Sequence, residues 1–253
     1  MGWIDSHCHI NFEQFDTSVL MPKLIEQNCE GVLVPATELA LFPDVIALQK
    51  QYSNLVYIAL GLHPYFLSSH KNKHLEQLDD HIRQFKPNAV GEFGLDFMLQ
   101  DVQQEQQYFY FREQLLIAKA HKLPLVIHCR KAHDQIASEI KKAGFIHGGF
   151  IHGFSGSFQQ AKRYLDLGFK LGLGGALTYE RAKAMHKMVA QLPDDGFTLE
   201  TDSPDMPPSF ANGGVNTPLN IPRIGQFVAD IRRQPLEHIL EVSRQSFYSI
   251  LKK

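Results

Sequence analysis

Several features that often decide a protein's class are scarce in this sequence. It has only three cysteines in 253 residues, Cys8, Cys29 and Cys129, too few and too irregularly spaced for a disulfide framework or a zinc ribbon. Lys and Arg number 25 against 27 Asp and Glu, for a net charge of −2. This balance excludes the basic footprint of a dedicated nucleic-acid binder. An anionic substrate would therefore have to be attracted by metal ions and a few local cations.

Long apolar runs are also absent. No stretch approaches the roughly 18 apolar residues of a membrane-spanning helix, and the opening residues lack the pattern of a secretory signal. We therefore expect a cytoplasmic protein without membrane association. No feature indicates an obligate protein partner, so we expect a monomer or weak homo-oligomer. With 44% hydrophobic residues, the chain has the composition of a globular protein with a sizeable core.

What the sequence does contain is a regular alternation of two patterns. Short apolar, β-branched runs predict strands at 2–6, 31–36, 55–61, 88–93, 125–129, 149–152, 169–173 and 197–201. Segments with a helical period lie between them, including 19–28, 39–51, 75–85, 103–121, 131–143, 158–167 and 179–192. Eight such units predict an α/β fold, a (β/α)8 TIM barrel that forms a single domain over residues 1–253. A doubly wound open sheet shows the same alternation.

The first strand leads into a His-x-His pair, His7 and His9. If the strand extends through these residues, alternation places both imidazoles on one face and Cys8 on the other. Two neutral imidazoles on one face can bind a single metal ion. An isolated His-x-His is more often two ordinary histidines, so the later strands decide the interpretation.

Further metal-ligating residue types lie at the carboxyl ends of the fourth, fifth, sixth and eighth predicted strands. They are Glu92, His128, His152 and Asp202. In a barrel, the carboxyl ends of the strands form one rim around one cavity, whereas an open sheet would spread them along a line. The set therefore favours the barrel. Four His, one Glu and one Asp exceed the needs of one tetrahedral site and suit a two-metal centre. Glu92, the acidic residue on a central strand of the rim, is the expected bridging ligand.

Six motifs in order along the chain resemble the TatD family of metal-dependent deoxyribonucleases, which are amidohydrolase-like TIM barrels. They are His7-x-His9, Gly61-x-His63-Pro64, Gly91-Glu92-x-Gly94-Leu95-Asp96, His128-x-Arg130, His152-x-Phe154-Ser155-Gly156 and Thr201-Asp202-Ser203-Pro204. The resemblance implies that His7, His9 and Asp202 bind one ion. It implies that His128 and His152 bind the other and that Glu92 bridges the two. His63 and Arg130 would contact the substrate phosphate.

The chain departs from this family in one loop. TatD nucleases carry a basic segment after the eighth strand, but here residues 210–218 read FANGGVNTP, without Lys or Arg. This difference leaves the metal centre intact and puts nucleic acid in doubt as the physiological substrate.

The leading hypothesis is a divalent-metal-dependent hydrolase that cleaves phosphodiester bonds in DNA or a small phosphoester. Two divalent ions, Zn, Mn or Mg, would activate water and stabilise phosphoryl charge. Catalysis would depend on Glu92 and on Asp202 as the candidate base. Two alternatives are a metal-dependent hydrolase of a carboxylic ester, lactone or amide, and a non-catalytic metal- or nucleotide-binding barrel.

Overall fold

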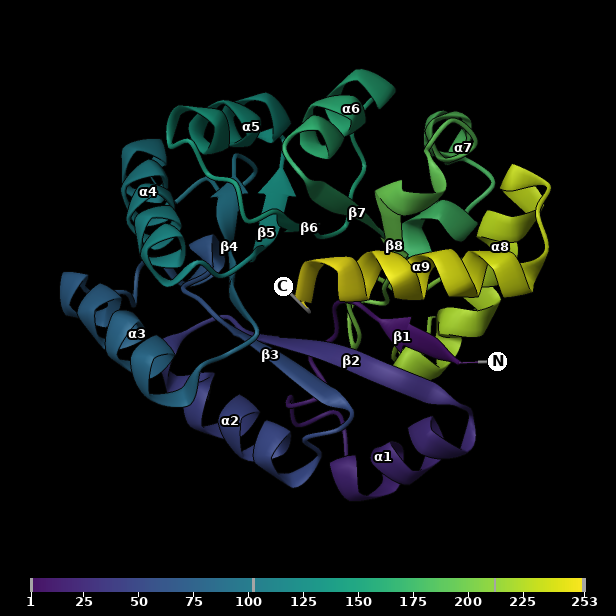
Figure 1. The fold of residues 1–253 in the computed structure, drawn as a ribbon, viewed down its shortest axis with the longest axis horizontal. Helices are drawn as coiled ribbons and strands as arrows, with labels where there is room; N and C mark the ends of the chain where they lie inside the picture. The colour runs from purple at the N-terminus through teal and green to yellow at the C-terminus, as the bar shows by residue number, and fades with distance from the viewer. Residues whose placement is uncertain (1, 102, 212, 252–253) are drawn as a thin grey trace.

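The computed structural model describes residues 2–101, 103–211 and 213–251. Eight parallel strands pair in chain order from first to eighth (Figure 1). The Ser6 N–H donates to the Leu199 carbonyl at 3.0 Å, which joins the last strand to the first. The predicted TIM barrel is therefore confirmed. The strands are β1 (Trp3–Asp5), β2 (Cys29–Ala36), β3 (Val56–Leu60), β4 (Ala89–Asp96), β5 (Leu125–Arg130), β6 (Gly149–Ile151), β7 (Phe169–Leu173) and β8 (Phe197–Leu199).

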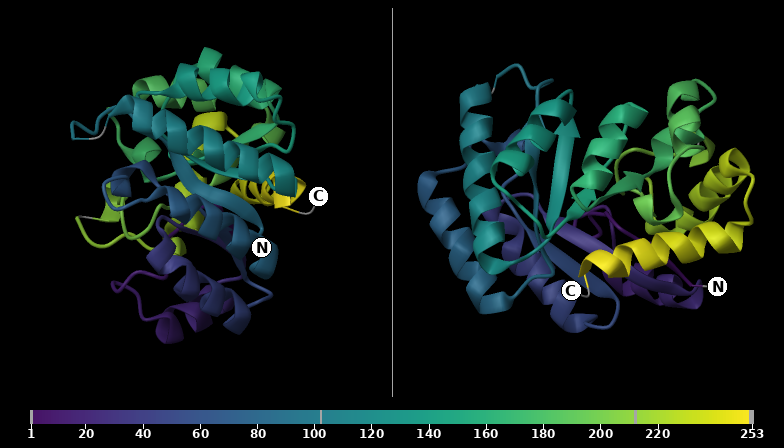
Figure 2. Two further views of the ribbon diagram at one scale, coloured as in Figure 1. Left: turned by 90° about the vertical axis from the view of Figure 1, so that its left-hand side faces the viewer. Right: turned by 45° about the horizontal axis from the view of Figure 1, so that its top comes forward.

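Helices surround the strands on the outside of the barrel (Figures 1 and 2). They bury apolar faces against the strands, and this packing forms the main core. The helices are α1 (Thr17–Glu26), α2 (Phe42–Gln51), α3 (Asn72–Phe85), α4 (Gln104–His121), α5 (His133–Lys142), α6 (Phe158–Asp166), α7 (Lys183–Val189), α8 (Ile221–Arg232) and α9 (Leu236–Leu251).

The last helix, α9, lies across the end of the barrel at which the strands begin (Figure 1). Phe247 and Ile250 on its inner face pack against Ile4, Val126 and Phe150 from the barrel interior. The hydroxyl of Ser243, on the same helix, accepts the Leu199 N–H at 2.8 Å. Because this end is filled, access to the barrel is from the opposite end, where the strands finish.

Several predicted boundaries are wrong. Helix α1 starts at Thr17 because the Asp16 carboxylate accepts the Ser18 N–H and caps it. The helix expected at 179–192 is only Lys183–Val189, since Tyr179 has an extended backbone. Strand β1 ends at Asp5 and β8 at Leu199. The residues that follow these two strands therefore lie in loops. Among the described residues, no helix combines the length and apolar character needed to cross a membrane.

Candidate metal centre

One half of the candidate centre lies within the paired strands β4 and β5. Gly94 stands opposite His128 in the parallel register, two residues from Glu92. A Cβ at Gly94 would collide with the His128 carbonyl, and one at Gly91 would collide with the Val126 carbonyl. The glycines of the Gly-Glu-x-Gly motif thus allow the two strands to approach closely. This approach brings the Glu92 carboxylate to the His128 imidazole, with Oε1 and Nδ1 3.2 Å apart.

The other half lies where β1 meets β8, in the loops beyond both strand ends. The Asp202 N–H donates to the His7 carbonyl at 2.9 Å, and the His9 N–H donates to the Ser203 carbonyl at 2.7 Å. Asp202 itself has φ +57 in the left-handed region. The two imidazoles still converge, with their Nε2 atoms 3.3 Å apart. Their convergence depends on these loop contacts and not on the strand alternation that we predicted.

Asp5, which sequence reasoning missed, organises this junction. Its fully buried carboxyl group accepts the His7 N–H at 3.1 Å, the Thr201 N–H at 3.0 Å and the Thr201 hydroxyl at 2.5 Å. Burial raises the pKa of Asp5 well above its usual value despite these bonds. The one sequence signal of this role is the position of an acidic residue, Asp5, in the first predicted strand.

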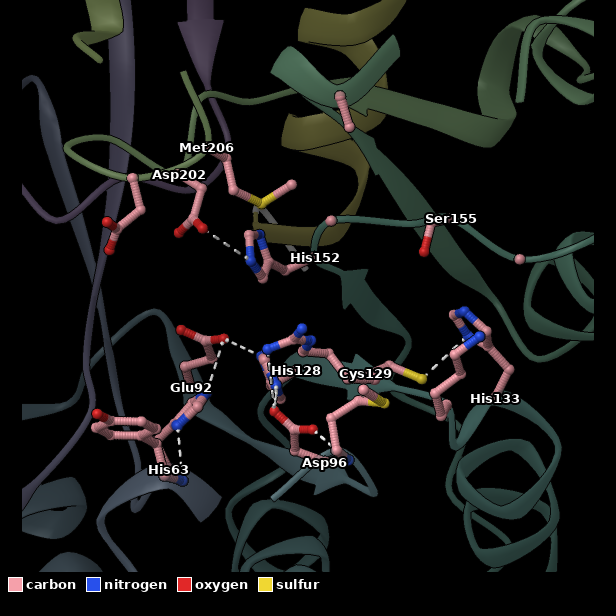
Figure 3. Close-up of a pocket in the computed structure, with 18 of the residues that line it drawn as sticks. His63, Glu92, Asp96, His128, Cys129, His133, His152, Ser155, Asp202 and Met206 are labelled. Atoms are coloured by element: carbon pink, nitrogen blue, oxygen red, sulfur yellow. Dashed lines mark hydrogen bonds and ion pairs between the residues drawn. The ribbon is translucent and has the colours of Figure 1, made fainter. Parts of the chain in front are cut away.

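Histidines and carboxylates that lie near the carboxyl ends of six different strands meet at one place, and Figure 3 shows several of them. Glu92 is at the centre, because its two oxygens face different sides. Oε2 lies 3.1 Å from His7 Nε2 and 3.6 Å from His9 Nε2. Oε1 lies 3.2 Å from His128 Nδ1 and 3.3 Å from His63 Nε2. Three groups have ligand atoms close enough to hold an ion: His7, His9 and Asp202; His7, Glu92 and His152; and His63, Glu92 and His128.

Groups on the outer side of three imidazoles indicate which nitrogen faces the centre. His9 Nδ1 is 3.2 Å from the Pro35 carbonyl, which can only accept, so Nδ1 carries the hydrogen and Nε2 presents its lone pair. His152 Nδ1 lies 3.0 Å from Glu200 Oε1, an ion-pair contact without hydrogen-bond geometry. His128 Nε2 lies 3.1 Å from Asp96 Oδ2, which leaves Nδ1 toward Glu92. Such partners orient metal-binding histidines and increase their basicity. Asp96 and Glu200 occupy these outer positions.

The inward-facing atoms form a set that fits a cation. The lone pair of His9 Nε2 points toward Asp202 Oδ1 at 3.5 Å, and both atoms are acceptors. His152 Nε2 lies 3.5 Å from Asp202 Oδ2. Neighbouring acceptors repel one another unless a proton or a metal ion lies between them. Imidazole and carboxylate are the ligands that Zn and Mn accept.

The pKa shifts of His152 and Glu92 also indicate that positive charge is favoured in the cluster. Burial disfavours the imidazolium form of His152, but Asp202 and Glu200 outweigh burial and raise the pKa well above its usual value. Burial also disfavours ionised Glu92, yet His7 and His63 hold its pKa well below the usual value. These contacts therefore favour ionised Glu92 and the charged form of His152.

His63 lies within reach of this cluster but is oriented as a donor. Its Nδ1 accepts the Tyr65 N–H at 3.1 Å. A neutral imidazole with an accepting Nδ1 carries its hydrogen on Nε2, the atom that faces Glu92. Burial, with His128 nearby, lowers the pKa of His63 to about 4, so the ring is neutral near pH 7. Nε2 of His63 therefore acts as a hydrogen-bond donor and offers no lone pair to a metal ion.

A cavity of about 1290 Å³ opens from the cluster toward solvent. Arg130 lines it with a side chain that is 60% exposed, and its Nη1 is 3.8 Å from Asp96 Oδ2. Among the aromatic residues near the rim, Tyr65 is exposed to this cavity, whereas Phe154 is buried in the core. Cys8 is buried as expected; Cys129 also lines the cavity and has its Sγ 3.0 Å from His133 Nδ1.

Comparison with known proteins gives relatives over nearly the full chain. A metal-dependent hydrolase of Escherichia coli K12, YjjV, is 39% identical over 252 residues, which cover 98% of this chain and 97% of that protein. The 3'-5' ssDNA/RNA exonuclease TatD of Erwinia amylovora is 28% identical, with 88% of this chain and 89% of that protein covered. These relatives support the prediction from the six motifs.

The fold gives the same result. The crystal structure of E. coli YjjV superposes with a TM-score of 0.95 at 38% identity, covering 99% of this chain and 98% of that chain. The family model described as TatD related DNase matches residues 4–252. The chain therefore belongs to the TatD family of metal-dependent hydrolases.

Proposed function

We propose that this protein is a phosphodiesterase with a two-metal centre. The proposal depends on one observation: the two carboxylate oxygens of Glu92 face different histidines. Oε2 faces His7 and His9, whereas Oε1 faces His128. A carboxylate with this placement can bridge two ions. Because the centre opens into a cavity, it leaves room for a substrate, whereas a purely structural site is closed by protein ligands.

The two halves of the cluster suggest how the ligands are shared. His7, His9 and Asp202 would hold one ion, and they form one of the three groups with mutually close ligand atoms. His128 and His152 would contribute to the second, each oriented by a carboxylate on its outer side. When bound, divalent ions would lower the pKa of a water molecule and polarise the phosphoryl oxygens.

The remaining residues supply proton transfer and substrate contacts. The Asp202 side chain is 16% exposed to the cavity, compared with 3% for Glu92. Asp202 is therefore the better placed of the two to accept a proton from the attacking water. The fixed Nε2–H of His63 and the guanidinium of Arg130 would donate hydrogen bonds to phosphoryl oxygens. These two contacts would orient the ester bond for attack.

The test is turnover by metal-stripped protein with Mg, Mn and Zn added back one at a time. Bis-p-nitrophenyl phosphate and single-stranded DNA serve as substrates, and the Glu92→Ala variant serves as the control. We expect metal-dependent cleavage of bis-p-nitrophenyl phosphate that is lost in the variant. Cleavage of DNA as well would add nuclease activity. Metal binding without cleavage of either substrate would contradict the proposal and direct attention to carboxylic esters, lactones and amides.

A further inference from the structure

The mouth of the cavity carries an unusual set of exposed apolar side chains. Nine large apolar side chains are exposed in the described part of the chain, and three of them line this cavity. They are Tyr65 at 64%, Met98 at 52% and Met206 at 38% exposure, which we call the apolar collar. Scattered exposed apolar residues need no explanation, but a group around a functional cavity indicates a binding surface.

Each residue of the collar is placed relative to the metal cluster. The Tyr65 N–H is bonded to His63 Nδ1 at 3.1 Å, and the Met98 N–H is bonded to Asp96 Oδ1 at 2.9 Å. Met206 lies beside Asp202 and His152 (Figure 3). Its carbonyl accepts the Asn216 amide at 3.2 Å. All three residues of the collar therefore line the cavity into which the cluster opens.

Charge around the cavity does not suit a long polyanion. Among the described residues that line it, the Lys and Arg side chains are Arg130 and Lys131, adjacent in sequence at the end of β5. Asp134 and Asp205 line the same cavity without being part of the metal cluster. A strand of nucleic acid would need a continuous cationic track along its phosphates. These two adjacent cationic side chains can neutralise the charge of one or two phosphate groups.

We propose that the apolar collar binds a planar aromatic ring attached to the phosphoryl group, so that the substrate is a compact nucleoside or aryl phosphate ester. Tyrosine stacks on planar rings, and methionine sulfur makes favourable contacts with ring edges. This inference rests on the proposed function, because it places the phosphoryl group at the metal cluster. It makes Tyr65, Met98 and Met206 the residues that determine specificity.

The test measures binding of three ligands to the full-length, metal-loaded protein by titration calorimetry. 2-Deoxyribose 5-phosphate has no aromatic ring, thymidine 5'-monophosphate adds a nucleobase, and phenyl phosphate carries a simple aryl ring. We expect at least one ligand with an aromatic ring to bind about tenfold more tightly than 2-deoxyribose 5-phosphate. The ligand with the larger gain distinguishes a nucleoside from an aryl substrate.

Variants locate the effect. Tyr65→Ser and Met206→Gln should each reduce the preference for the ring about three- to tenfold and leave the affinity for 2-deoxyribose 5-phosphate unchanged. Tyr65→Phe and Met206→Leu should retain the preference, because they keep the stacking and apolar surfaces. Ile146→Gln, at a side chain 79% exposed that does not line the cavity, is the matched control and should change neither affinity.

Three results would overturn the inference in different ways. If all three ligands bind equally and in a metal-dependent manner, the collar does not recognise a ring, while the proposed function stands. If none of the three binds in a metal-dependent manner, the phosphoryl site itself is wrong and the collar proposal fails with it. A ring preference that persists in both Tyr65→Ser and Met206→Gln would place the ring elsewhere in the cavity.

Discussion

The two halves of the candidate metal centre are built in different ways. Glu92 and His128 lie within the strands β4 and β5, and the ladder between these strands sets their distance. His7, His9 and Asp202 lie beyond the ends of β1 and β8, where Asp5 and a few loop hydrogen bonds hold them. The first half is fixed by local pairing and the second by contacts between the two ends of the sequence. Loss of one buried residue should therefore affect the second half more than the first.

The largest expected effect concerns Glu92, which joins the two halves. Glu92→Gln keeps the side-chain shape but removes the charge that both histidine sets face. We expect kcat/KM for bis-p-nitrophenyl phosphate at saturating metal to fall on the order of a thousandfold or more. Circular dichroism should show an unchanged fold, and Glu105→Gln, an exposed residue of α4, should retain activity. Activity within tenfold of the wild type in Glu92→Gln would mean that this carboxylate does not bridge the halves.

The second prediction tests the junction of β1 and β8. Asp5→Ala removes the acceptor of three buried hydrogen bonds, and we expect the free energy of unfolding to fall by about 2–4 kcal/mol. Urea denaturation measures the loss, and the exposed Asp101→Ala is the control. A loss below about 0.5 kcal/mol, the range of ordinary surface substitutions, would show that the junction does not depend on Asp5.

The third prediction tests separately the two carboxylates that contact the outer sides of His128 and His152. Asp96→Asn should disturb His128 and Glu200→Gln should disturb His152, each weakening the affinity for one ion by about ten- to a hundredfold. Metal titration with measurement of bound ions per chain should then show one site weakened and the other retained. Wild-type affinities at both sites in both variants would contradict the orienting role of these carboxylates.

The smallest expected effect is the response of the folded protein to chelation. At free metal about tenfold above its Kd, binding at one site adds about 1.4 kcal/mol. Removal of the ion from one site should therefore lower Tm by roughly 3–6 °C. Hydrogen exchange should show that residues 6–10 and 200–206 lose more protection than residues 92–96 and 126–129. Equal loss in both regions would remove the distinction between the loop-held and strand-held halves.

The same distinction explains what the sequence could predict. The alternation of apolar runs and helical segments predicted the barrel, and the residues after the strands predicted which side chains would gather on its rim. The sequence did not show that β1 ends at Asp5, because Asp5 depends on Thr201, nearly 200 residues away along the chain. It also did not show which nitrogen of His63 carries the hydrogen, since that follows from a local turn. The proposed ligand roles of the six residues remain predictions.

The sequence also did not predict the apolar collar, because its residues are far apart along the chain. Met98 and Met206 are separated by more than a hundred residues and lie in loops without a recognisable motif. Their exposure at one cavity follows only from barrel closure, which brings the loops after β4 and β8 to the same rim. The absence of Lys and Arg from the loop after β8 is the sequence feature that argues against a nucleic-acid strand as the substrate, and this remains a prediction.

The most direct test is a crystal structure with anomalous scattering measured at the absorption edges of added Mn or Zn. We predict two anomalous peaks on either side of Glu92, one contacted by His7, His9 and Asp202 and the other by His128 and His152. A single peak, or two peaks that do not share Glu92, would contradict the two-metal account.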